Sequence, residues 1–472
     1  HPDGAPRRRY SLVEAHAFSR RRLVTAFVSG APGGREVEPV RPGRTIVGGI
    51  ALAVLLLLGA VVAGVFAPRT PQDWNKVGLV VSKDDGGLYV ITESSDHPVL
   101  RPVINVTSAK LILGDLAADP TPLSTSFIQS QRIGEDVGIL GAPHDVPAPE
   151  RLIGSGWTAC TDSGLGIRVD IGPRPDVTAA PGRGLVVQSE GDYFVVAEAL
   201  SDDRVHPTAY RYRLPTQSGP RDNMLAALGL PAGVEAVEVP PAWLALFPAG
   251  GDLTWESMGI EHAGQPASID AAGSDDRYRV GDVVISADDA VVLTEVGPAP
   301  MTTFALAVYE NLPEPYTPRV FRDDQVDLGR VDRPYADAHW PVDLPTAAVG
   351  EACVQLAAAT DAPPRVTLAE LPGGRASADG VSAGTSAVGM DPGSGALVVA
   401  GDWSQTEGGS PFLVDAKGRA YPLLVPAALR LGYGGVDPTR VPDGWLELFA
   451  DGVTLSPQAA LCPPEAADKP CG

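Results

Sequence analysis

The chain has 472 residues, too many for one compact core, and this length is typical of about three domains. Apolar residues make up 44% of it and charged residues 20%, while Gly and Pro together reach about 21%, which favours turns and short strands over long soluble helices. The formal charge of −22 at pH 7 argues against nucleic acid or anionic lipid as the main partner.

Residues 1–44 form a basic tail. Nine Arg stand against four Asp and Glu, a net charge of +5. Within the tail, residues 11–29 carry apolar side chains at helical spacing, with Arg20–Arg22 on the other side. This pattern predicts a short helix that meets cytoplasmic partners, and a solvated helix without a partner has the same pattern. Residues 30–44 read as a Pro/Gly/Arg linker. The chain begins at His1 rather than Met, so the true N-terminus is left open.

Residues 45–67 contain no charge and read TIVGGIALAVLLLLGAVVAGVFA. As a helix they would extend about 35 Å, enough to cross a hydrocarbon core of about 30 Å. The alternatives are a buried core helix and a cleaved signal peptide, whose apolar region is shorter and nearer the start. We therefore expect a single-pass membrane protein. Positive charge stays in the cytoplasm, so the tail is cytoplasmic and the rest, with a charge of −27 once the +5 tail is subtracted from −22, lies outside.

Small residues recur at four-residue spacing in this apolar run. Such residues let helix backbones approach closely in lipid, although Gly and Ala are common in any membrane helix. The face expected to pack against another helix consists of Gly59, Ala60, Ala63 and Gly64.

Beyond the apolar run, the sequence repeats itself. Residues 86–114 and 395–434 each read as two apolar strands, a His/Tyr-Pro step and a helix, with His97-Pro98-Val99-Leu100 aligned to Tyr421-Pro422-Leu423-Leu424. A further copy ends in VPPAWLALFPAG, which aligns Trp243 with Trp445 of VPDGWLELFADG; core packing and a binding surface both explain this cluster. The expected repeats are residues 75–120, 184–250, 277–310 and 395–458.

The remaining segments, 133–183 and 320–390, lack the repeat and hold one distant cysteine each. They predict a split central core joined by a Cys160–Cys353 disulfide. Cys462 and Cys471 would close a clip in the C-terminal tail, residues 459–472. Export permits both bridges, and free or partner-bridged thiols are the alternative. The predicted fold class is α+β, with four sheet-and-helix repeats around this core.

None of the motifs in the sequence supports a catalytic, cofactor-binding or metal-binding site. GVSAG around Ser382 matches a nucleophile elbow, but it lies in Gly/Ser-rich sequence without the strand and helix which that motif needs. There is no P-loop, no CxxC pair and no H-E-x-x-H. The sequence therefore predicts no catalytic, cofactor-binding or metal-binding residues.

The combination of motifs resembles the EccB family, a core membrane component of the type VII (ESX) secretion system of actinobacteria. The resemblance rests on FSRRRLVTAFVSG (18–30) before the apolar run and on GLYV…HPVL…N-x-x-SAKLI (87–112) after it. GWTAC with its distant cysteine and VPDGWLELFADGVTLSPQAA near the end complete it. It implies an elongated extracytoplasmic domain whose repeats are similar to cell-wall-binding modules of a phage lysin. It also implies the partners EccC, EccD and EccE.

These observations predict a structural subunit that anchors and organises the secretion complex in the cell membrane. A second copy of the chain and the cell wall remain open as further partners. A wall-binding module acting alone is one alternative function. An ATP-hydrolysing component without a P-loop is the other, because ATPase activity has been attributed to the family.

Overall fold

The computed structural model describes residues 71–464, with gaps at 163, 201–204, 271–272, 288, 314, 323–330, 336–337, 361, 372–376 and 405–407, together with a few positions between 17 and 56. The chain divides into two compact units, 1–71 and 72–472. In the first, the described positions are helical, including residues 49–54. Among the described residues, no helix is long and apolar enough to cross a membrane. Most of the predicted helix 11–29 and span 45–67, and all of Gly59, Ala60, Ala63, Gly64 and Cys471, lie outside the described residues.

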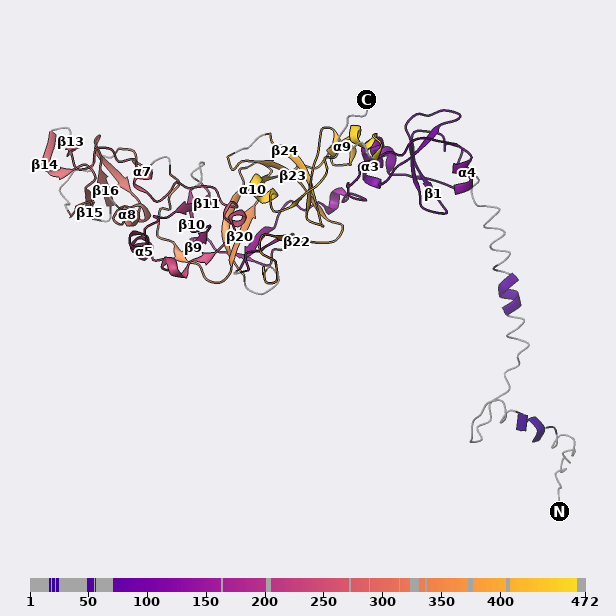
Figure 1. Ribbon diagram of the computed structural model, residues 1–472, viewed down its shortest axis with the longest axis horizontal. Helices are drawn as coiled ribbons and strands as arrows, with labels where there is room; N and C mark the ends of the chain where they lie inside the picture. Colours follow the sequence, from indigo (N-terminus) through magenta and orange to yellow (C-terminus); the bar gives the residue numbers. More distant parts are fainter. Residues whose placement is uncertain are drawn as a thin grey trace, which may run out of the picture. The chain divides into compact units, whose positions relative to one another are not determined.

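The second unit mixes strands with short helices, in agreement with the α+β prediction, and its described residues form six sheets (Figure 1). Four of these sheets share one pattern. Three consecutive strands form an antiparallel meander, a helix follows, and a fourth strand returns parallel to the first. Successive side chains of a strand point to opposite faces of its sheet, so the consecutive buried residues of strands such as β9 (Arg183–Ser189) and β23 (Gly395–Gly401) give those sheets an apolar surface on both faces.

The first sheet has the order β4-β1-β2-β3-β5. Its elements are β1 (Gly78–Ser82), β2 (Leu88–Ile91), β3 (Val99–Pro102), α3 (Val106–Leu113), β4 (Thr121–Leu123), α4 (Thr125–Gln129) and β5 (Arg132–Ile133). Asn105 caps α3, since its side chain accepts a hydrogen bond from the Ser108 backbone N–H at 2.7 Å. The Ser108 hydroxyl in turn accepts from the Ile139 N–H at 2.9 Å. The N-x-x-S motif thus starts a helix and holds the following loop.

The second, third and fourth sheets repeat the pattern. The second contains β9 (Arg183–Ser189), β10 (Asp192–Leu200), β11 (Pro207–Arg213), α5 (Ser218–Ala227), β12 (Val237–Glu238), α6 (Pro241–Leu244) and the added β19 (Thr346–Ala347). The third contains β15 (Val283–Ser286), β16 (Asp289–Leu293), β17 (Pro298–Met301), α8 (Thr303–Tyr309) and β18 (Val320–Arg322). The fourth contains β23 (Gly395–Gly401), β24 (Ser410–Asp415), β25 (Arg419–Pro422), α9 (Ala427–Arg430), β26 (Thr439–Pro442), α10 (Asp443–Leu446) and β27 (Ala450–Asp451).

The central sheet is assembled from two distant stretches of chain, in the order β22-β7-β6-β20-β21-β8. The first stretch gives β6 (Trp157–Thr161), β7 (Ile167–Ile171) and β8 (Thr178–Ala179). The second gives β20 (Ala352–Ala357), β21 (Arg365–Glu370) and β22 (Ser386–Met390). Two strands within residues 320–390 lie elsewhere, because β18 pairs with β15 and β19 pairs with β9. The short elements that remain are α7 (Trp255–Met258), the hairpin of β13 (Pro266–Asp270) and β14 (Gly273–Arg279), and α11 (Pro457–Ala460).

The strand register corrects one sequence alignment. Leu100 pairs with Ile133, and Ala420 pairs with Asp451, so Leu100 corresponds to Ala420. Pro102 is therefore the counterpart of Pro422, whereas His97-Pro98 precedes β3. The His-Pro-Val-Leu alignment was wrong because a Pro beside apolar residues recurs at both ends of this strand, and only the hydrogen-bonded register separates the two positions.

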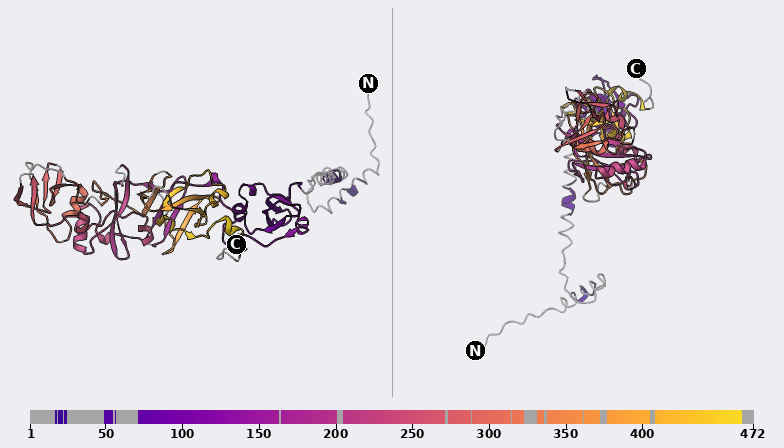
Figure 2. Two further views of the ribbon diagram at one scale, coloured as in Figure 1. Left: turned by 90° about the horizontal axis from the view of Figure 1, so that it is seen from above. Right: turned by 90° about the vertical axis from the view of Figure 1, so that its left-hand side faces the viewer.

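The first and fourth sheets pack against each other through α3, α9 and α11 (Figures 1 and 2). Leu111 of α3 lies in one buried cluster with Leu413, Tyr421 and Leu455. The Gly138 N–H donates to the Cys462 carbonyl at 3.0 Å, and the Tyr433 hydroxyl donates to the Pro147 carbonyl at 2.7 Å. The first and the last segments of this unit are therefore held in contact by this cluster and these hydrogen bonds.

Candidate functional site

The centre of the unit is a buried disulfide between neighbouring strands. β6 and β20 are antiparallel, and their register places Cys160 opposite Cys353 with a Cα–Cα distance of 4.1 Å. The predicted bridge is therefore present, and it joins residues 193 apart in sequence. The chain-entropy model gives such a loop at most about 5 kcal/mol of stabilisation. Cys471 lies outside the described residues, so its pairing with Cys462 stays a prediction.

Two short helices dock on the central sheet. Trp243 of α6 and Trp445 of α10 are fully buried, in one cluster with Trp157, Val354 and Leu356 of the sheet. Phe247 packs edge-on against Trp243 at 5.0 Å between ring centroids, and Phe449 packs against Trp157 at 5.8 Å. The Trp/Leu/Phe pattern of the sequence therefore forms core packing and is closed to partners.

The two tryptophans differ in one polar contact. The Trp243 indole N–H donates to the Ala159 carbonyl of β6 at 3.2 Å. The Trp445 indole nitrogen is equally buried, and within the described residues it has no hydrogen-bond partner. A buried donor without a partner costs free energy, so the two docked helices contribute unequally to the stability of the core.

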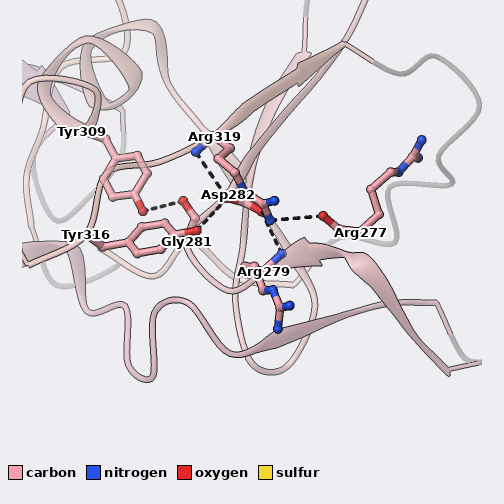
Figure 3. Close-up of polar contacts among 7 residues, drawn as sticks. All are labelled: Arg277, Arg279, Gly281, Asp282, Tyr309, Tyr316 and Arg319. Atoms are coloured by element: carbon pink, nitrogen blue, oxygen red, sulfur yellow. Dashed lines mark hydrogen bonds and ion pairs between the residues drawn. The ribbon is translucent and has the colours of Figure 1, made fainter.

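Asp282, at the turn into β15, is a fully buried charged residue with several hydrogen-bond partners (Figure 3). Its carboxylate accepts hydrogen bonds from the Arg279 N–H at 2.8 Å, the Tyr316 hydroxyl at 2.7 Å and the Arg319 Nε at 3.1 Å. The Tyr309 hydroxyl donates to the adjacent Gly281 carbonyl at 2.6 Å. Gly281 has φ +93°, and a Cβ there would lie 2.9 Å from the Tyr316 ring, so this turn requires glycine.

These contacts compensate the negative charge of the Asp282 carboxylate, and they accompany shifts in the pKa values of its neighbours. Burial raises the pKa of the Tyr316 phenol, and its hydrogen bond to Asp282 adds to that shift. Burial likewise raises the pKa of Tyr309. The hydrogen bond to Asp282 raises the pKa of the Arg319 guanidinium. With every acceptor position engaged, the cluster ties the segment before β18 to the turn at Gly281 and has no group left for chemistry.

Other candidate groups in the described part of the chain lie at the surface. Ser382 is exposed in a turn that leads into β22, without the strand-to-helix step of a nucleophile elbow. Glu261, His262 and Glu295 bring their ligand atoms within 4.8 Å of one another, but all three are exposed, and His262 Nδ1 lies within hydrogen-bond distance, 3.2 Å, of Glu295 Oε2. Two cavities measure about 190 and 200 Å³, below the 300 to 1,000 Å³ typical of ligand pockets.

Comparison with protein families resolves what kind of molecule this is. Residues 8–467 match the family model described as "Type VII secretion system ESX-1, transport TM domain B". The chain belongs to this family, EccB. The match covers nearly the whole chain, including the tail and the apolar run as well as all six sheets.

Curated EccB relatives align over shorter stretches. The "ESX-1 secretion system ATPase EccB1" of Mycolicibacterium smegmatis (strain MKD8) is 34% identical over 117 residues, which are 25% of this chain and 23% of that protein. The "ESX-3 secretion system ATPase EccB3" of Mycobacterium tuberculosis (strain ATCC 25618 / H37Rv) is 30% identical over 173 residues, 32% of this chain and 30% of that protein. The aligned stretches thus span 23% and 30% of these two relatives' lengths.

Solved structures share the EccB fold over longer stretches. A chain in "Structure of an intact ESX-5 inner membrane complex" is 21% identical with a TM-score of 0.59, covering 98% of this chain and 96% of that chain. A chain in "Structure of EccB3 dimer from the ESX-3 core complex" is 21% identical with a TM-score of 0.60, covering 82% of this chain and 100% of that chain. The mixed fold of several sheets and short helices is therefore shared with the chain of the EccB3 dimer structure.

Sequence reasoning missed the Asp282 cluster of this EccB chain. Its members come from the end of β14 (Arg279), the turn before β15 (Asp282), helix α8 (Tyr309) and the loop before β18 (Tyr316 and Arg319). A signal was present, since Gly281-Asp282 directly precedes the apolar run Val283–Ser286, and a buried Asp at a strand start needs several donors.

Proposed function

We propose that this chain is a structural subunit of the type VII (ESX) secretion membrane complex that holds other subunits in place. The observation that carries the proposal is the family match over residues 8–467. The architecture supports it, because buried side chains at the centre of the unit serve packing, with two tryptophan helices and a disulfide fixing one rigid core. A rigid body with docked modules suits a subunit that positions its neighbours.

In this proposal, residues 45–67 are a single membrane-spanning helix, with residues 1–44 in the cytoplasm and the remainder outside. The charge difference between the +5 tail and the acidic remainder supports this orientation. The four repeats, at 75–120, 184–250, 277–310 and 395–458, surround a core built from 133–183 and 320–390. The shared pattern of the four sheets and the two-part central sheet support that division.

The proposed partners are the membrane subunits EccC, EccD and EccE and a second copy of the chain. Structures of similar chains come from an ESX-5 inner membrane complex and from an EccB3 dimer, which supports both kinds of contact. The small-residue face of the span, Gly59, Ala60, Ala63 and Gly64, is the proposed helix contact.

Affinity purification of the tagged full chain from membranes tests this proposal. We expect the other secretion subunits to elute with it. Replacing Gly59, Ala60, Ala63 and Gly64 together by Leu should weaken their recovery, because larger side chains keep helix backbones apart. The matched control replaces Val61, Val62 and Val65 by Leu and should leave recovery unchanged. If the chain elutes alone and binds purified cell wall instead, it is a wall-binding module.

ATP hydrolysis is the second candidate function, because the curated relatives carry the word ATPase in their names. Two of the cavities, of about 190 and 200 Å³, are each smaller than a typical ligand pocket and give this function no support. Phosphate release by the purified full chain, measured against a mock preparation, decides between the two functions. Hydrolysis well above the mock level would refute a purely structural role.

A further inference from the structure

Among the described residues, a short helix follows the fourth strand of the first, second and fourth sheets and occupies an equivalent place in each. The fourth strands pair with the first strands at Thr121, Val237 and Thr439. Six positions later in each case stand Phe127 of α4, Trp243 of α6 and Trp445 of α10. The aromatic ring that docks on the central sheet in the second and fourth sheets therefore has a counterpart in the first sheet.

The surroundings of this counterpart are different. Trp243 and Trp445 are fully buried, whereas Phe127 is half-buried. The next turn changes as well, because Leu246 and Phe247 correspond to Ser130 and Gln131. Ser130 is exposed. The face of α4 that matches the docked faces of α6 and α10 is thus left open to solvent, and it keeps one ring beside polar side chains.

Two more aromatic side chains gather on the same face of the first sheet. Trp74, Tyr89 and Phe127 all pack, partly buried, on the cluster that contains Val80 and Leu100. The rings of Trp74 and Phe127 meet edge-on at 4.9 Å between centroids. Helix α3 packs on the opposite face of this sheet, where its residues join Leu79 and Val90 in another cluster, and Figure 1 shows α3 and α4 on opposite sides of β1.

This aromatic face lies close along the chain to the proposed membrane span. Trp74 is seven residues beyond Ala67, and seven residues extend at most about 25 Å. The contact between the Trp74 and Phe127 rings places α4 beside Trp74. Trp and Tyr collect at membrane interfaces, because their rings lie against acyl chains while their N–H and O–H groups meet water and headgroups. The acidic charge of the exported part disfavours anionic lipid, so neutral headgroups are the matching surface.

We propose that Trp74, Tyr89 and Phe127 form an interfacial face that rests on the outer surface of the membrane and contacts zwitterionic lipid. Ser130 and Gln131 then lie among the headgroups, which accounts for polar residues where α6 and α10 have Leu and Phe. The first sheet would thereby fix the height and orientation of the extracytoplasmic domain above the bilayer. This inference rests on the proposed span at residues 45–67.

The test uses the full chain in nanodiscs of phosphatidylcholine whose acyl chains carry bromine, a short-range quencher of tryptophan fluorescence. The emission that is lost in a Trp74→Phe variant is the emission of Trp74. We expect brominated lipid to quench this component relative to unbrominated lipid. The matched control is Trp403→Phe, since Trp403 is also partly buried but lies in the turn after β23 of the fourth sheet. The Trp403 component should be equally bright in both lipids.

A second probe covers the case in which Trp74→Phe disturbs the fold. A fluorophore on Ser130→Cys should be quenched by nitroxide-labelled lipid, and one on Thr216→Cys, an exposed position near α5, should not. If Trp74 and the Ser130 label both ignore the lipid quenchers in chains that are inserted in nanodiscs, this inference is overturned while the span stands. If the Ser130 label is shielded only when other secretion subunits are added, the face binds protein and the inference is again overturned. A chain that does not enter nanodiscs at all removes the span and this inference together.

Discussion

The paired tryptophans provide an internal comparison of what a buried hydrogen bond contributes to this fold. Replacing Trp243 or Trp445 by Phe removes the same atoms from two equivalent, fully buried positions. The cost of lost packing is therefore similar at the two sites. The polar part differs, because the Trp243 indole N–H donates to the Ala159 carbonyl at 3.2 Å and that of Trp445 has no partner within the described residues.

The size of the difference follows from these two environments. At position 243, Phe loses a hydrogen bond with a net contribution of about 1 kcal/mol. At position 445, Phe removes an unsatisfied buried donor, whose desolvation costs about 1 to 3 kcal/mol. The packing losses cancel in the comparison. We therefore expect Trp243→Phe to destabilise the core more than Trp445→Phe by about 2 to 4 kcal/mol.

Hydrogen exchange of the β6 amides in the full chain, measured across a guanidinium series, gives the required free energies. This local readout is needed because a chain of several sheets does not have to unfold in one step. The Trp157→Phe variant is a useful control, since the Trp157 indole nitrogen also has no partner within the described residues. Equal losses for the two main variants, or a larger loss at Trp445, would refute the reasoning and indicate that a water satisfies the Trp445 donor.

Three further predictions test the disulfide, the tyrosines and the Asp282 cluster. Replacing Cys160 and Cys353 together by Ala should lower the free energy of unfolding by at most about 5 kcal/mol in the chain-entropy model. Removing the predicted bridge of Cys462 and Cys471, which closes a shorter loop, should lower it by about 3 kcal/mol. Equal shifts in the denaturation midpoint of the two variants would contradict this order. Burial raises the pKa of Tyr421 to about 12, above its ordinary 10.0. A raised tyrosine pKa means that the neutral form is favoured by folding, so this stability is complete below pH 10 and is lost as pH rises toward 12. Circular dichroism across that pH range should show alkaline unfolding that Tyr421→Phe makes less steep, and an unchanged profile would argue against this assignment. Asp282→Ala leaves the Arg279 N–H and the Tyr316 hydroxyl without their acceptor and removes the partner of Arg319, so it should destabilise this region more than Tyr316→Phe, which loses one hydrogen bond and should cost about 1 kcal/mol. Limited proteolysis before β18 compares the two variants, and equal cleavage rates would contradict the difference.

The disulfide and the two tryptophan helices could be predicted from the sequence, because Cys and Trp are residue types with few other roles. Cys160 and Cys353 stand one in each of the two segments between the repeats, and their register in β6 and β20 follows from the pairing of these two segments. Trp243 and Trp445 stand within matching stretches of twelve residues. In both cases, the rare side chain is fully buried and packed on all sides. The sequence pattern therefore indicates the packing directly.

The sequence failed where the deciding contact is a backbone register or a dispersed polar network. The position of Pro98 and that of Pro102 are equivalent in local composition, and only the strand register identifies Pro102 as the counterpart of Pro422. Asp282 and Arg319 are 37 residues apart. No periodicity connects such residues, since their contact is created by the return of β18 alongside β15.

The helix α4 shows why a repeat can be missed when its environment changes. In α6 and α10, the central sheet requires Trp, Leu and Phe at fixed spacing, and the sequence retains them. In α4, only Phe127 and Ile128 still pack on their own sheet, while Ser130 and Gln131 are free to be polar. The backbone position is preserved because β4 and β5 hold both ends of the helix. The residues that differ between equivalent helices therefore follow what each helix packs against: the central sheet for α6 and α10, and, among the described residues, the first sheet for α4.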